Sequence, residues 1–248
     1  MAVPAPRGRA GSAPDTPLPF SPGRALAIGA HPDDVEFYAG GTVRRLVEAG
    51  AEVTLVVCSD GGRGGAAREP AALRRAEQDA AADRLGIARL VWLGHPDGEL
   101  APGDPLRAEL VRELRRARPE LVLAHDPQTL WTVIGGIAEP GHSDHRAAGQ
   151  AAIDAVYPRA ASPHYHPEQL ATHGLEPWYP RELWLFDTAA PDLRVEVAGA
   201  FPRKLDALRQ HASQEAAAAG LLGPARAHAA HWGAAERPAE AFVRLRLY

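Results

Sequence analysis

AHPDD, at residues 30–34, places an imidazole and two carboxylates within four positions of the chain. It follows a short apolar run, residues 25–29, that predicts a buried strand. It precedes residues 35–49, where apolar side chains recur at helical spacing. A solvated turn with one aspartate as a helix N-cap would explain one of the carboxylates. The remaining groups are better explained by a cation that neutralises them.

The composition of the 248 residues is typical of a globular protein and favours one large α/β domain. A net charge of −4 without a basic run argues against a nucleic-acid partner, and no apolar run reaches membrane-spanning length. The single cysteine, Cys58, excludes an internal disulfide and is consistent with a reducing, cytoplasmic compartment. Residues 1–23 contain six prolines and are expected to form a disordered tail, so the domain is assigned to residues 24–248.

Three further apolar runs predict strands that alternate with helices. The predicted strands are residues 52–58, 90–93 and 121–124, and the helices between them are residues 71–85 and 106–117. Strands and helices in alternation form a parallel sheet with right-handed crossovers. We therefore predict an α/β, Rossmann-like fold, in which a mainly parallel sheet is flanked by helices in a single domain.

Each predicted strand ends in a polar or glycine-rich segment. After AHPDD these segments are SDGGRGG (59–65), HPDGE (95–99) and HDP (125–127), and GHSDH (141–145) follows the last of them. Ligands of such sheets bind at the carboxyl ends of the strands, so these segments are expected to meet at one site. The glycine-rich loop lacks the lysine and the spacing of a P-loop, and we interpret it as a loop that faces the substrate.

His142 and His145 lie three residues apart at the start of a predicted helix, on neighbouring parts of one face. One of them could bind a metal ion while the other faces the substrate. A catalytic zinc ion usually takes three protein ligands and keeps one position for water. His31, Asp34 and His145 would complete such a set, which predicts Zn²⁺ as the cofactor.

The residues beside this set carry groups suited to catalysis. Asp33 would be left free to take a proton from the bound water. His142 would polarise a substrate carbonyl, and Asp144 could orient the His142 ring. Together these residues predict a metal-dependent hydrolase.

Four motifs in this order resemble the PIG-L (LmbE-like) family of zinc-dependent N-acetylglucosaminyl deacetylases. They are AHPDD after the first predicted strand, GGRG after the second, LGHPDGEL after the third and GHSDH after the fourth. The likeness extends over residues 24–215 and includes ELWLFDT and RKLDALRQHASQ. It implies a Rossmann-like fold, zinc bound by His31, Asp34 and His145, a general base at Asp33 and an electrostatic or acid role for His142.

The resemblance also implies contacts with a substrate. Asp97, within HPDGEL, matches a position expected to reach sugar hydroxyls. Arg63 or Arg68, in or next to the glycine-rich segment, could contact the substrate as well.

Residues 157–180 are proline-rich and irregular, and a segment of this kind is expected to be a lid or an insertion.

We therefore expect the protein to remove the N-acetyl group from an N-acetylglucosaminyl substrate, a small-molecule sugar conjugate, releasing acetate and a free amine. The nearest alternative is an amidase of the same family that acts on a larger acyl group, such as a thiol conjugate. A non-catalytic sugar- or nucleotide-binding domain is the third possibility. Asp33, which a binding domain would not need, argues against it.

Overall fold

The computed structural model describes residues 16–64, 70–134, 136–216 and 220–248. A seven-stranded sheet forms the centre of the domain, with the strand order β3-β2-β1-β4-β7-β9-β8. Its parallel part comprises β1 (Arg24–Gly29), β2 (Glu52–Ser59), β3 (Arg89–His95), β4 (Leu121–His125) and β7 (Glu182–Phe186). Two antiparallel strands complete one edge, β9 (Ala239–Arg246) beside β7 and β8 (Leu193–Glu196) beside β9.

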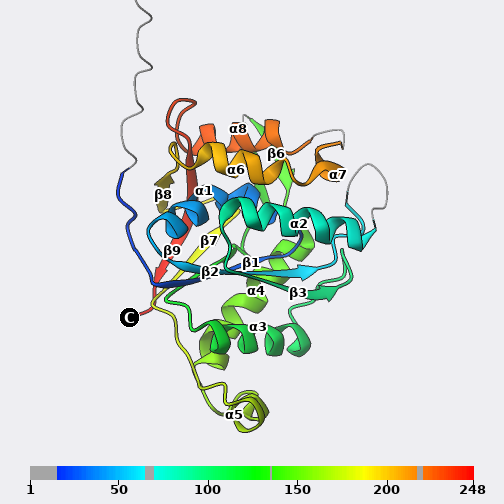
Figure 1. Cartoon of the computed structure of the whole chain (residues 1–248), viewed down its shortest axis with the longest axis vertical. Coiled ribbons are helices and arrows are strands. Elements are labelled where there is room, and N and C mark those ends of the chain that lie inside the picture. Colours follow the sequence, from blue (N-terminus) through cyan, green and yellow to red (C-terminus); the bar gives the residue numbers. More distant parts are fainter. Residues whose placement is uncertain (1–15, 65–69, 135, 217–219) are drawn as a thin grey trace, which may run out of the picture.

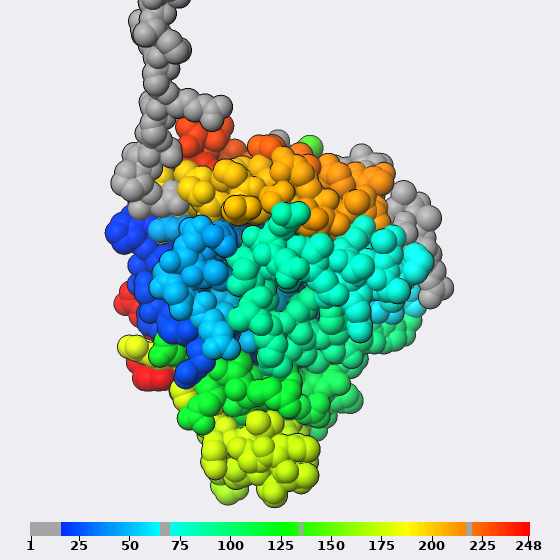
Figure 2. Space-filling model, in the orientation of Figure 1, coloured from blue at the N-terminus to red at the C-terminus, as the bar shows by residue number. Residues whose placement is uncertain are grey.

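Helices cover both faces of this sheet (Figure 1). On one face lie α1 (Asp34–Glu48), α2 (Ala71–Leu85) and α6 (Phe201–Leu208), together with α7 (Ala212–Glu215) and α8 (Leu222–Trp232). On the other face lie α3 (Asp104–Ala117) and α4 (Ser143–Asp154). Figure 2 shows α6 and α7 as a band across α1 and α2. Within the described ranges, no helix is both long and apolar enough to cross a membrane.

Each face of the sheet has its own apolar core, because side chains alternate between the two faces along every strand. Leu26 and Ile28 of β1 belong to the core that includes α3 and α4, while Ala25 and Ala27 belong to the core that includes α1 and α2. All four side chains are almost fully buried. The predicted fold class, a Rossmann-like and mainly parallel sheet flanked by helices, is confirmed.

The strand order reverses between β1 and β4, since β2 and β3 lie on one side of β1 and β7 lies on the far side of β4. At such a switch point the loops that follow neighbouring strands diverge and leave a crevice at the carboxyl ends. Gly149 lets α4 lie directly against the end of β4, because a Cβ atom at this position would collide with the carbonyl oxygen of His125. The loop after β1 and the start of α4 therefore border the same crevice.

Two short strands between β4 and α4 form a β-hairpin separate from the main sheet. Its strands, β5 (Trp131–Ile134) and β6 (Ile137–Pro140), pair with each other in antiparallel register. Trp131, Val133 and Ile137 are more than half exposed. The hairpin leads directly into the GHSDH segment and so connects β4 to α4.

Residues 157–180 pack along α3 and form a protrusion beyond that helix (Figure 2). The segment begins within η1 (Ala155–Ala160), which is kinked at Tyr157, where the backbone is extended with φ −144° and ψ 132°, and it contains α5 (Pro167–His173). The buried guanidinium of Arg115 in α3 donates hydrogen bonds to backbone carbonyl oxygens of this segment. The N···O distances are 2.8 to 3.4 Å, and the acceptors are the carbonyl oxygens of Arg159, Ala160, Ser162, Tyr165 and His166. Arg115 thus holds residues 157–180 against α3, and none of them is among the residues that line the crevice cavity. This position is compatible with the insertion, one of the two alternatives expected from the sequence.

Residues 16–23 pack on the domain, in contrast to the disordered tail that the sequence predicts there. Leu18 and Phe20 contact the core that includes α1, and the Arg181 guanidinium lies 5.4 Å from the centre of the Phe20 ring. The difference arises because these two apolar side chains, placed among prolines, have surface to bury. Residues 1–15, the remainder of the expected tail, lie outside the described residues.

Replacing Arg115 tests the placement of residues 157–180. Loss of its buried guanidinium leaves several carbonyl groups without donors, so Arg115→Met is expected to lower the free energy of unfolding by about 2–4 kcal/mol. Arg116→Met is the matched control. The Arg116 side chain is half exposed, and its ion pair with Glu113 is expected to contribute less than about 1 kcal/mol. Urea unfolding of both variants gives the comparison, and equally small losses would contradict the placement.

Candidate active site

The crevice at the carboxyl ends of β1 and β4 contains a cavity of about 480 Å³. Its polar lining comes from segments that are far apart in the sequence. They are the strand-end segments AHPDD, SDGGRGG and HPDGE, the GHSDH segment at the start of α4, and residues of α1, α2 and α7. The polar lining residues include His31, Asp33, Asp34, Arg63, Arg74, Asp97, His142 and His145. The structure therefore brings four of the five predicted segments to the cavity, whereas none of its lining residues comes from HDP (125–127).

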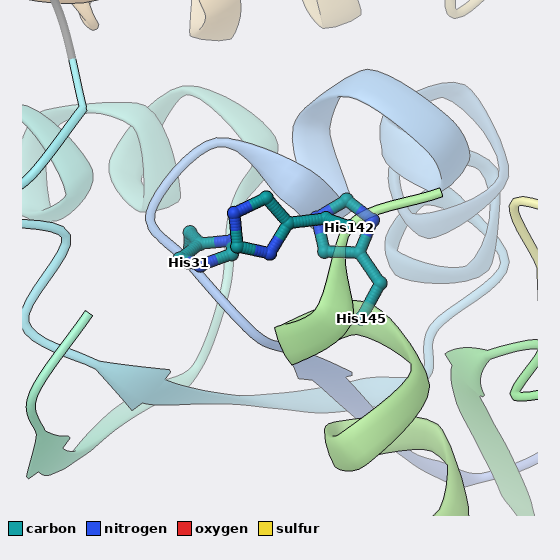
Figure 3. A group of neighbouring side chains, drawn as sticks. All are labelled: His31, His142 and His145. Carbon is teal, nitrogen blue, oxygen red and sulfur yellow. The ribbon is translucent and has the colours of Figure 1, made fainter. Parts of the chain in front are cut away.

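Three imidazole rings gather between the loop after β1 and the start of α4 (Figure 3). His31 comes from the loop, His142 is the N-cap residue of α4 and His145 lies in its first turn. The centre of the His31 ring lies 4.6 Å from that of His142 and 5.3 Å from that of His145. One nitrogen of each ring lies within 4.8 Å of a nitrogen of the other two. Rings this close are compatible with a shared metal ion.

Asp34, buried in the first turn of α1, carries the carboxylate that joins two of these rings. Its Oδ1 lies 3.2 Å from His145 Nε2, and its Oδ2 lies 3.6 Å from His31 Nδ1. Burial alone would raise the pKa of Asp34, but the imidazoles of His145 and His125 hold it well below its usual value. His31, Asp34 and His145, the predicted ligand set, are therefore brought together around an ionised carboxylate.

In both His31 and His145, the ring nitrogen that does not face Asp34 lies next to another carboxylate. His31 Nε2 lies 3.2 Å from Asp97 Oδ1 and 3.3 Å from Asp144 Oδ2, and His145 Nδ1 lies 2.9 Å from Asp187 Oδ2. Because an ionised carboxylate only accepts hydrogen bonds, we assign the ring protons to these nitrogens. His31 Nδ1 and His145 Nε2 are then lone-pair donors on the side of Asp34. Metal-binding histidines commonly have this arrangement, so the donor set fits a divalent metal ion.

Asp33 lies beside the donor set and has a different environment. Its backbone is left-handed, with φ 92°, and its N–H donates to Gln78 Oε1 at 3.0 Å. Arg74 Nη2 donates to Asp33 Oδ2 at 3.0 Å. Burial raises the pKa of Asp33 to about 7, and the Arg74 guanidinium opposes this rise. Asp33 thus lines the cavity with a carboxyl group suited to exchanging protons near neutral pH.

His142 is oriented by backbone and not by a carboxylate. Its Nδ1 accepts a hydrogen bond from the backbone N–H of Asp144 at 3.1 Å, so the neutral ring carries its proton on Nε2. Burial and the neighbouring histidines lower the pKa of His142 and favour this neutral form.

The sequence predicts that the Asp144 carboxylate orients the His142 ring. In the structure this carboxylate contacts His31 instead. The reason is that it also accepts hydrogen bonds from the backbone N–H groups of Gly98 and Leu100, at 2.7 and 3.3 Å. These bonds turn the carboxylate towards the loop after β3.

Of the predicted substrate-binding residues, Asp97 and Arg63 line the cavity, and Arg68 lies outside the described residues. Both carboxylate oxygens of Asp97 have protein partners. Oδ1 lies near His31 Nε2, and Oδ2 accepts from the backbone N–H of Arg63 at 2.8 Å. The Arg63 guanidinium pairs with Glu99. Asp97 thus holds the glycine-rich loop next to His31 and still borders the cavity.

No role is predicted from the sequence for three further residues of the site, which are Arg74, His125 and Asp187, although His125 lies in HDP and Asp187 in ELWLFDT. Arg74 extends from α2 and also donates to the carbonyl oxygen of Pro32 at 2.6 Å. His125 is fully buried at the end of β4, with Nε2 3.0 Å from Asp34 Oδ2. A local sequence signal exists for His125, which follows the predicted strand 121–124, and for Asp187, which follows the apolar run LWLF within ELWLFDT. Arg74 gives no such signal among the arginines of a helix.

A parallel sheet with an imidazole and carboxylate donor set in its switch-point crevice is typical of a metal-dependent α/β enzyme. Residues 26–156 match the PIG-L family, GlcNAc-PI de-N-acetylase. The chain is also 33% identical over 196 residues to the diacetylchitobiose deacetylase of Thermococcus kodakarensis, covering 77% of this chain and 70% of that protein. The chain therefore belongs to the PIG-L family.

Two other comparisons bear on the reaction. The structure of N,N'-diacetylchitobiose deacetylase from Pyrococcus horikoshii superimposes with a TM-score of 0.79 and 29% identity, covering 91% of this chain and 84% of that one. A mycothiol S-conjugate amidase from Streptomyces coelicolor is 30% identical over 146 residues, 48% of this chain and 47% of the amidase. The family predicted from the four motifs is confirmed, and with it the class of enzyme, a hydrolase of N-acetyl amides.

One divalent metal ion per chain is expected at this site. His145→Ala removes a ligand nitrogen and should abolish tight binding, whereas His95→Ala should leave it unchanged. His95 is the control histidine, because it ends β3 near the same edge of the sheet but its Nε2 contacts Glu109, at 2.7 Å, outside the cavity. Metal analysis after dialysis should give about one equivalent for the wild type and for His95→Ala. Equal metal content in the two variants would contradict the assignment.

Proposed function

We propose that the protein is a zinc-dependent deacetylase that removes the N-acetyl group from an N-acetylglucosaminyl substrate and releases acetate and a free amine. The observation that carries this proposal is the donor set of His31, Asp34 and His145 with the Asp33 carboxyl beside it. Nitrogen and oxygen ligands with an open position suit a catalytic zinc ion. The similarity to a diacetylchitobiose deacetylase over most of the chain supports a small-molecule sugar conjugate as the substrate.

Asp33 is the proposed general base, and the zinc ligands would be His31, Asp34 and His145. A bound zinc ion would supply Lewis acidity that activates water and polarises the acetyl carbonyl. Asp33 accepts a proton from the attacking water as the new bond to the acetyl carbon forms. Arg74 favours the ionised form of Asp33 that this step requires. The proton then passes from Asp33 to the amine nitrogen as the C–N bond breaks.

His142 is the proposed oxyanion donor. Its neutral ring carries the proton on Nε2, which can donate to the carbonyl oxygen as negative charge develops there. The backbone N–H of Asp144 fixes this tautomer by donating to Nδ1. Asp144 supports catalysis in a second way, because its carboxylate contacts Nε2 of His31 and leaves Nδ1 for the metal.

An amidase acting on a larger acyl group is the second candidate. The similarity to the mycothiol S-conjugate amidase supports it, although the alignment covers about half of each chain. The cavity also has an apolar part formed by Phe37, Tyr38 and Leu221, which would accept an acyl group longer than acetyl. The longer alignment with the deacetylase is the reason to favour the sugar substrate.

A panel of amides distinguishes the two candidates. We would incubate the zinc-loaded enzyme with N-acetylglucosaminides that differ in aglycone, diacetylchitobiose among them, and with thiol-conjugate amides that contain no sugar. Release of free amine and of acetate are measured separately. The proposal predicts that N-acetylglucosaminides have the highest kcat/KM and yield equal amounts of both products. The highest kcat/KM for amides without a sugar would instead favour the amidase.

Asparagine substitutions at two neighbouring positions separate the base from the ligand. Asp33→Asn should keep zinc and lower kcat by about two to four orders of magnitude, because the proton acceptor is lost. Asparagine tolerates the left-handed backbone at this position, so the fold should be retained. Asp34→Asn should instead lose zinc. Zinc retained by Asp34→Asn and lost by Asp33→Asn would show that the two roles are exchanged.

Asp97 can be tested with the same assay. Asp97→Asn keeps the size of the side chain but removes its charge, both at His31 and towards substrate hydroxyls. We expect kcat/KM for N-acetylglucosaminides to fall by about 10-fold or more while zinc remains bound. Unchanged kcat/KM would remove Asp97 from the proposed substrate-binding residues.

A further inference from the structure

Asp187 occupies a constrained position at the end of β7, next to the site. It is the first residue after that strand and has a left-handed backbone, with φ 56°. Parallel pairing places Phe186, the last residue of β7, opposite His125, the last residue of β4. A non-glycine residue in this conformation is uncommon and requires support from its surroundings. Here the surroundings are the side chains that border the metal donor set.

The first contact of Asp187 is with His145, one of the proposed zinc ligands. Asp187 Oδ2 lies 2.9 Å from His145 Nδ1, and the Asp187 side chain is only 10% exposed. With its proton held on Nδ1, the His145 ring can turn only its Nε2 lone pair towards Asp34 and the cavity.

The second contact of Asp187 is with His125, which is fully buried. Its Nδ1 lies 3.7 Å from Asp187 Oδ2, and its Nε2 lies 3.0 Å from Asp34 Oδ2. The His125 ring also stacks on the His145 ring, with 4.0 Å between ring centres and 25° between planes. His125 therefore contacts both Asp34 and His145 from the interior of the protein, on the side away from the cavity.

We propose that Asp187 and His125 form a brace that positions two of the three metal ligands, His145 directly and Asp34 through His125, and so sets the affinity for the metal ion. This inference rests on the ligand set of the proposed function. The two residues are positioning residues, because neither lines the cavity where a substrate would bind. Partners that orient metal-binding histidines and carboxylates typically contribute about 10- to 100-fold to metal affinity.

Metal affinity measured without substrate tests the brace. Asp187→Asn is the first variant, because asparagine keeps the shape of the side chain and tolerates φ 56°. The second is His125→Phe, which keeps a buried ring against His145 but removes the contact with Asp34. Asp126→Asn is the matched control, because Asp126 is also buried at this end of the sheet and accepts a hydrogen bond from the backbone N–H of Gln128 at 2.9 Å.

The zinc dissociation constant of each variant is measured by competition with a chromophoric chelator, and thermal unfolding of the metal-free proteins is recorded in parallel. We expect the constant to rise about 10- to 100-fold in Asp187→Asn and in His125→Phe, and to change less than about twofold in Asp126→Asn. A purely structural role would lower the melting temperature of metal-free Asp187→Asn and leave its zinc affinity unchanged.

Zinc affinity within twofold of the wild type in Asp187→Asn would overturn the brace, as would an equal loss in Asp126→Asn. If Asp187→Asn does not fold, the same criteria apply to His125→Phe. The measurement needs no substrate, so its outcome is independent of the reaction. A wild-type protein that binds zinc but hydrolyses no N-acetylglucosaminide would overturn the proposed function, and the affinities would still decide the brace.

Discussion

The Asp34 carboxylate is almost completely buried, and nitrogen atoms of His31, His125 and His145 lie 3.0 to 3.6 Å from its oxygens. A buried carboxylate without compensation is unfavourable by several kcal/mol or more, so this group requires positive charge nearby. Imidazolium protons can supply that charge, and so can a metal ion. The lone pairs of His31 Nδ1 and His145 Nε2 point to the metal ion as the partner for which the site is arranged.

The fold class could be predicted from the sequence, because it follows from the apolar runs and the alternating helices. The apolar runs do not reveal that the strand order reverses between β1 and β4, nor that β8 and β9 continue the sheet in antiparallel direction. Nor do they reveal that residues 157–180 lie on α3, since this depends on tertiary contacts such as those of the buried Arg115 guanidinium and of the Gln169 amide, which donates to Ala108 O. Such placements depend on tertiary contacts that have no local sequence pattern.

The same distinction applies to the site. His31 and His145 could be proposed from the sequence because each lies in a short motif at the end of a predicted strand or at the start of a helix. Asp187 contacts His145 only because β7 pairs with β4, and Arg74 contacts Asp33 only because α2 packs across the loop after β1. Donors and bases can therefore be found from motifs, whereas the side chains that orient them depend on the register of the sheet and the packing of helices.

Crystals of the zinc-loaded protein, with diffraction recorded on both sides of the zinc absorption edge, would test the central claim most directly. The account predicts one anomalous peak per chain, about 2.0–2.2 Å from His31 Nδ1, a carboxylate oxygen of Asp34 and His145 Nε2. A peak bound by His125 in place of His31, or the lack of any peak in the crevice, would contradict it.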